Sequence, residues 1–193
     1  MTAYSVPATR YTDTAIALHW LLALMLLVSF GVGRYMADLP LSPQRLRLFN
    51  WHKWAGATIL ALTLLRLLWR ATHRPPALPT MPRWQVWAAR LSHALLYLLC
   101  LAVPLVGWGR SAAAGYPLVW FGVLPLPDIA PVDRDLTALL KTWHANLAWA
   151  LAALVLLHLG AALKHQLIDR DGLLARMRPG WFRPARSTPT PSP

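Results

Sequence analysis

Long apolar runs alternate with short polar and basic segments along this chain. The apolar runs cover roughly residues 14–33, 49–69, 86–109 and 138–163. Each has close to the roughly 20 residues that a helix needs to cross the ~30 Å hydrocarbon layer of a bilayer. Backbone groups in lipid must find hydrogen bonds within their own segment, so the pattern predicts an all-α, integral membrane four-helix bundle.

Proline and polar residues indicate the limits of this bundle. Pro104 lies inside the third run, where we expect a kink rather than a break. The segment 110–137 is too broken to span and is expected to pack as a lid at the outer surface. Residues 1–178 are predicted to form one transmembrane domain, and residues 179–193, of low complexity, a disordered tail. No cleavage pattern follows the first run, so it is expected to remain as an anchor.

Composition and charge support lipid as the solvent. Of the 193 residues, 56% are hydrophobic and 13% are charged, which excludes an ordinary soluble domain. The net charge of +12 comes from residues between the apolar runs, which favours anionic headgroups over nucleic acid. Twelve of the 19 Lys and Arg lie on the side that holds both chain ends and the connection between the second and third runs, against seven on the opposite side. The positive-inside rule therefore predicts that both termini are cytoplasmic.

The cysteine content limits the available chemistry. Cys100 is the single cysteine, which excludes an internal disulfide, a thiolate metal cluster and a CxxCH site for covalent haem. Any haem must be held without covalent bonds to the chain.

The histidines are the candidate chemical groups. All 7 except His73 fall inside or at the ends of the apolar runs, where an ionisable side chain is costly and indicates function. The predicted topology sorts them into two layers. The outer layer contains His52 and His144, and the cytoplasmic layer contains His19, His93, His158 and His165.

His144 and His158 have the most informative spacing. They are fourteen residues apart, which is about 21 Å along a helix axis and close to four whole turns. Both imidazoles should project from one helix face at two depths, as axial ligands of two stacked haems would. His52 would complete the outer haem, whereas the spacing leaves His19 and His93 as alternatives for the inner one.

Two other interpretations of these histidines are open. Each could be a buried polar residue bonded to a neighbouring helix, as polar side chains between membrane helices often are. They could also bind zinc, although zinc prefers three or four converging ligands, often with Cys or carboxylate. No carboxylate lies inside any predicted span.

Histidine-centred motifs extend over nearly the whole chain, from Tyr11 to about Arg178. They are LHWL with His19, WHKWAG with His52, RLSHALLYLL with His93, KTWHANLAW with His144, and LLHLGAALKHQ with His158 and His165. Together they resemble the bacterial cytochrome b561 family of four-helix, di-haem membrane cytochromes, which includes a superoxide-oxidising member.

The resemblance implies specific roles for these residues. It implies two haem b groups, with iron bound by His52 and His144 on the outer side and by His19 and His158 on the inner side. It also implies a quinone site near the inner haem, where His93 and His165 are candidates and ubiquinone is the expected acceptor. The expected location is the bacterial inner membrane.

The function expected from this reading is one-electron transfer from a periplasmic-side donor to membrane quinone. The donor could be superoxide, which would make the chain a superoxide oxidase; otherwise it is an electron carrier. Near the outer entrance, four basic residues would attract that anion: Arg45, Arg47, Lys53 and Lys141.

Two alternative functions differ in their partners. The chain could be the cytochrome b membrane-anchor subunit of a larger dehydrogenase or hydrogenase complex and accept electrons from a partner protein. It could instead be a haem-free structural protein, which a visible spectrum would reveal.

Overall fold

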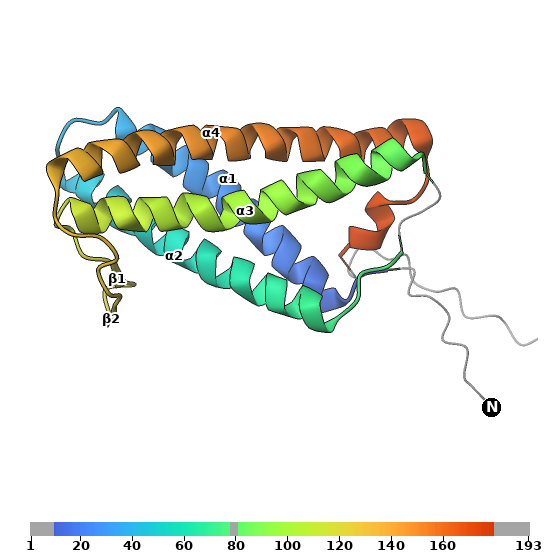
Figure 1. Cartoon of the computed structure of the whole chain (residues 1–193), viewed down its shortest axis with the longest axis horizontal. Helices are drawn as coiled ribbons and strands as arrows, with labels where there is room; N and C mark the ends of the chain where they lie inside the picture. Colours follow the sequence, from blue (N-terminus) through green and yellow to red (C-terminus); the bar gives the residue numbers. More distant parts are fainter. Residues whose placement is uncertain (1–9, 78–80, 180–193) are drawn as a thin grey trace, which may run out of the picture.

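Four long helices make up most of the computed structural model, which describes residues 10–77 and 81–179 (Figure 1). All four are long and apolar enough to cross a membrane, so the predicted all-α membrane fold is confirmed. The tail predicted from residue 179 onward lies, apart from its first residue, outside the described residues. The helices are α1 (Asp13–Ala37), α2 (Pro43–Thr72), α3 (Arg83–Ala113) and α4 (Arg134–Lys164).

Successive helices pack against one another: α1 on α2, α2 on α3, and α3 on α4. Because each helix crosses the bundle in the opposite direction to the one before it, the described chain begins and ends at the same end (Figure 1). We call this the termini end. The opposite end carries the strands β1 (Val119–Trp120) and β2 (Leu124–Pro125), and we call it the hairpin end.

Each helix extends past the apolar run that predicted it. At three helix starts, the side chains of Thr12, Ser42 and Asp133 accept a hydrogen bond from the backbone N–H three residues later. An apolar run marks only the part of a helix that lies in lipid, whereas capping residues fix where the helix begins. Helix α3 continues through Pro104.

The outside of the bundle is apolar. Side chains such as Leu27 and Leu156 are 72% and 68% exposed. An apolar surface over the whole bundle is unfavourable in water but favourable in the hydrocarbon of a bilayer. The buried apolar residues of the described chain include Ile16, Leu18, Leu22, Ile59 and Leu151.

The hairpin is anchored to α2 by two tryptophans. The indole N–H of Trp54 donates to the Val119 carbonyl at 2.6 Å, and that of Trp120 donates to the Thr58 hydroxyl at 3.1 Å. The segment predicted to be a lid, 110–137, thus contributes its ends to α3 and α4, while its middle packs beside α2.

At the termini end, the chain turns back from α4 across the bundle. A π-helical turn, η1 (His165–Asp169), leads through Arg170, which has a φ of 53°, to a short 3₁₀ helix, η2 (Leu174–Met177). The indole N–H of Trp20 on α1 donates to the Met177 carbonyl at 2.9 Å. The last described segment is therefore fastened to the start of α1 (Figure 1).

Candidate functional site

The first candidate site lies between α2 and α4, toward the hairpin end. The rings of His52 and His144, both half-buried, have centres 6.0 Å apart and planes at 88° to each other. The two residues that the sequence placed in one layer are therefore brought together from different helices.

Hydrogen bonds fix the orientation of these two rings. Nδ1 of His144 lies 3.0 Å from the Val103 carbonyl oxygen, which can only accept, so Nδ1 carries the proton. In a neutral imidazole the lone pair then lies on Nε2, where it can bind a metal. Nδ1 of His52 lies 3.2 Å from the hydroxyl oxygen of Ser29, which is buried on α1. A metal-binding histidine typically makes such a hydrogen bond through the ring nitrogen that does not bind the metal, which here is Nδ1.

Two glycines give these rings their space. A Cβ added to Gly107 on α3 would lie 2.8 Å from Cε1 of His144, and one added to Gly33 on α1 would lie 3.1 Å from Cε1 of His52. The missing side chain of Gly107 lets His144 come close enough to α3 to reach the Val103 carbonyl. A Cβ added to Gly56 on α2 would instead meet only Pro104 Cβ at 3.9 Å, an ordinary helix-packing contact.

The second candidate site lies toward the termini end, around His158 on α4. The centre of its ring is 6.2 Å from that of His19 on α1, with planes at 73°. It is also 5.5 Å from the ring of His93 on α3, with planes at 64°. The structure thus brings both alternatives for the inner site next to His158.

Arg66 lies beside this second group of histidines. Its guanidinium donates to the Tyr97 hydroxyl and to the Ala15 carbonyl, both at 3.1 Å, and so links α2 to α3 and α1.

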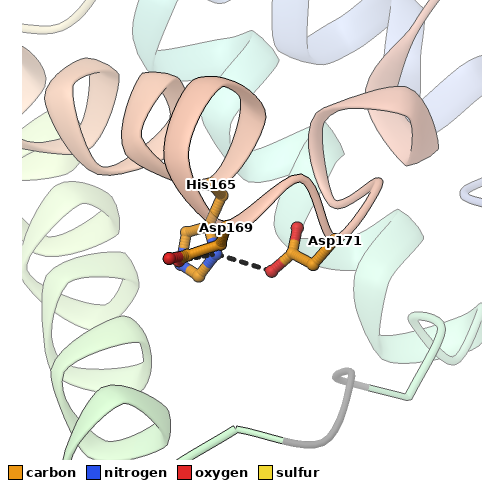
Figure 2. Close-up of side chains that lie close together, drawn as sticks. All are labelled: His165, Asp169 and Asp171. Atoms are coloured by element: carbon orange, nitrogen blue, oxygen red, sulfur yellow. Dashed lines mark hydrogen bonds and ion pairs between the residues drawn. The ribbon is translucent and has the colours of Figure 1, made fainter.

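His165 lies in a separate polar cluster at the end of α4 (Figure 2). Its Nδ1 is 2.6 Å from Asp171 Oδ2 and 3.1 Å from Asp169 Oδ2, and Asp169 also pairs with Lys164 at 2.6 Å. Burial opposes ionisation of Asp171, but hydrogen bonds from the Leu173 N–H and from His165 outweigh it and lower its pKa. The two aspartates carry a signal that the sequence reading missed: acidic residues four and six positions after a histidine.

Comparison with known proteins identifies the family. The model of the family described as prokaryotic cytochrome b561 matches residues 10–180. The chain belongs to this family. Cytochrome b561 homolog 2 of Escherichia coli (strain K12) is 34% identical over 179 residues, covering 87% of this chain and 90% of that protein. Cytochrome b561 homolog 1 of the same organism is 32% identical over 172 residues, covering 88% and 97%.

A further relative carries a more specific name. The probable superoxide oxidase CybB of Yersinia pestis is 29% identical over 175 residues, covering 88% of this chain and 96% of that protein. The resemblance expected from the sequence motifs is therefore confirmed. As a cytochrome b561, the chain is a multi-pass bacterial membrane cytochrome of electron transport that binds b-type haem.

The two histidine sites fit this cofactor. Metal–imidazole bonds are about 2 Å long and the ring centre lies about 1 Å behind the nitrogen, so two imidazoles on opposite sides of one iron have centres roughly 6 Å apart. The separations at His52–His144 and His19–His158, 6.0 and 6.2 Å, match that spacing. The 5.5 Å between His93 and His158 is closer than this.

Proposed function

We propose that this cytochrome b561 holds two b-type haems, one toward each end of the bundle, and passes single electrons between a donor at the hairpin end and membrane quinone. The proposal rests on one observation: two pairs of histidines from different helices lie at two depths, each with the ring spacing that suits one iron.

The ligand residues have defined tasks in this proposal. His52 and His144 bind iron at the hairpin end, and His19 and His158 bind it toward the termini end. Val103 and Ser29 hold the first pair in orientation through Nδ1, which leaves Nε2 for the metal. When bound, each haem supplies a one-electron change of its iron, and the low-dielectric site shields that change from water.

Superoxide is the donor that we propose. Supporting this are the name of the relative from Yersinia pestis and the basic residues near the hairpin end, Arg45, Arg47, Lys53 and Lys141. A small anion is drawn to such a surface, which raises its encounter rate. Donation of one electron converts superoxide to dioxygen.

Quinone is the proposed acceptor, at the termini end. Two electrons and two protons convert a quinone to its quinol, so this site needs proton donors beside the cofactor. His93, next to His158, and His165, paired with Asp171, are the candidates. We further propose that the termini end faces the cytoplasm of a bacterial inner membrane, as the positive-inside rule predicts.

Haem counting tests the central proposal. Wild-type protein should contain two haems and show b-type bands on reduction, whereas His144→Ala and His158→Ala should each retain one. Unchanged haem content in both variants would rule out the assigned ligands. Superoxide consumption by the purified protein alone supports an independent oxidase, and constant co-purification with a soluble redox subunit would favour the membrane-anchor role instead.

A further inference from the structure

Two arginines from different helices approach the same phenylalanine at the hairpin end. The guanidinium carbon of Arg45 on α2 lies 5.6 Å from the centre of the Phe49 ring, and that of Arg110 on α3 lies 5.9 Å from the same centre. All three side chains are half-buried. The two like charges are also close enough to interact across the boundary between α2 and α3.

Neither guanidinium is neutralised by the protein. All 7 acidic residues of the chain lie in its described part, and none forms a salt bridge with Arg45 or Arg110. Nε of Arg45 is buried and has no hydrogen-bond partner among the described residues. Burying an unpaired donor of a charged group is costly, and two nearby cations repel each other, so this arrangement favours an anion between them.

The helical spacing places this pair above the first histidine site. Arg45 and Phe49 precede His52 by seven and three residues and so lie on the same face of α2, with Arg45 about 10 Å further toward the hairpin end. Arg110 follows Gly107 by three residues on α3, and His144 packs against Gly107. The two arginines therefore lie at the hairpin-end mouth of the space between His52 and His144.

We propose that Arg45 and Arg110 together bind one carboxylate, held beside Phe49 at the mouth of the hairpin-end histidine site. Two guanidinium forks can donate several parallel hydrogen bonds to one carboxylate, which a single lysine cannot do. Arg47 lies on the same helix but is exposed and is not one of the arginines beside Phe49. The carboxylate is either a propionate of the haem, in which case the inference rests on the proposed function, or a dissolved small carboxylate.

The experiment uses purified full-length protein and the variants Arg45→Gln, Arg110→Gln and, as the matched control, Arg47→Gln. In the first arm, haem labelled with ¹³C at its propionate carboxylates is followed by reduced-minus-oxidised infrared spectroscopy. In the second arm, acetate binding is followed by saturation-transfer NMR, which works with or without haem. Thermal unfolding and haem content show that each variant is folded, and Arg45→Lys retains the charge if Arg45→Gln is unstable.

Each source of the carboxylate gives its own result. A propionate predicts that the labelled band shifts in Arg45→Gln and Arg110→Gln but not in Arg47→Gln, while acetate does not bind the haem-loaded protein. A dissolved carboxylate predicts saturable acetate binding that weakens at least about tenfold in the same two variants. The inference is overturned if the labelled band and acetate binding are the same in all three variants. If the purified protein contains no haem, the proposed function is contradicted. Acetate binding by the three variants would then show whether Arg45 and Arg110 bind a carboxylate.

Discussion

At the scale of single residues, the histidine sites depend on glycines in the neighbouring helices, whose missing side chains leave room for the rings. His144 reaches the Val103 carbonyl across α3 because Gly107 has no side chain there. The same relation holds between His52 and Gly33 on α1. Small residues between membrane helices commonly allow close approach of backbones, and here they allow close approach of a ring.

Gly107→Ala should therefore weaken haem binding at the hairpin end. The new Cβ would lie 2.8 Å from Cε1 of His144, so the ring must move and its bond to Val103 is strained. Overpacking of this kind costs about 1–3 kcal/mol, or roughly five- to 150-fold in affinity. Haem-to-protein ratio and haem dissociation rate measure it. Gly160→Ala on α4, where nothing lies within 4 Å, is the control, and equal haem retention by both variants would contradict the prediction.

Substitution should distinguish His19, the expected iron ligand, from His93, which we expect to lie beside the haem without binding its iron. We expect His19→Ala to lose one haem, because the ring spacing to His158 suits an iron between them. His93→Ala should retain both haems and reduce quinone more slowly, by about tenfold to several hundredfold if His93 supplies a proton. Visible spectra and quinol formation measure the two effects, with His73→Ala as the control. Loss of haem in His93→Ala, with normal content in His19→Ala, would reverse the assignment.

At the scale of elements, the end of α4 is a junction between the bundle and the segment that crosses its termini end. The π-helical turn brings His165 to Asp169 and Asp171 (Figure 2). The following residues run back to α1, where the Trp20 indole N–H donates to the Met177 carbonyl. Charged groups around this turn also include Lys164 and Arg176. Ion pairs and hydrogen bonds therefore help to hold this turn and the last described segment in place.

Acid should remove the contribution of Asp171 to this turn. The pKa of Asp171 is lowered in the folded protein, so its stabilising effect is present above the ordinary value of 3.8 and is lost as the pH falls through the lowered value. Asp171→Asn should lower the unfolding temperature slightly at about pH 6, because exposed ion pairs contribute about 0–1 kcal/mol. The difference from wild type should shrink as the pH falls below 3.8 and the Asp171 carboxylate becomes protonated. Asp128→Asn, at the hairpin end, is the control, and a difference that persists in acid would show that the carboxylate charge is not responsible.

At the scale of the whole molecule, charge and lipid determine how the bundle works. The apolar outer surface suits the bundle to the bilayer, and of the basic residues near the hairpin end Arg47 and Lys141 are exposed. Under the proposed function, superoxide arriving there would meet a positive surface. Salt screens such attraction over a Debye length of about 10 Å at 0.1 M.

The rate of superoxide oxidation should therefore fall several-fold between about 10 mM and 300 mM salt. Replacing Arg47 and Lys141, both exposed near the hairpin end, by Gln should flatten this dependence, whereas Arg74→Gln near the termini end should not. Pulse radiolysis of the haem-loaded protein measures the rate. A rate that does not respond to salt in the wild-type protein would exclude steering by these charges.

The sequence alone determined the fold class of the protein and the two levels in the bilayer at which its histidines lie. Four apolar runs of bilayer length predict four helices because lipid offers the backbone no other partner. The fourteen-residue spacing of His144 and His158 predicts two sites on one face because both lie on a single helix of fixed rise. These inferences need only local geometry, and the family match agrees with the class.

Tertiary structure decided which side chains meet across helices. Sequence spacing fixes positions along one helix but not the rotation of one helix against another, so it could not choose between His19 and His93 beside His158. It also could not show that Gly107 makes room for His144, or that Arg45 and Arg110 share one phenylalanine. The contacts of Gly107 with His144 and of Arg110 with Phe49 arise only when the helices pack, because each joins residues far apart in the chain.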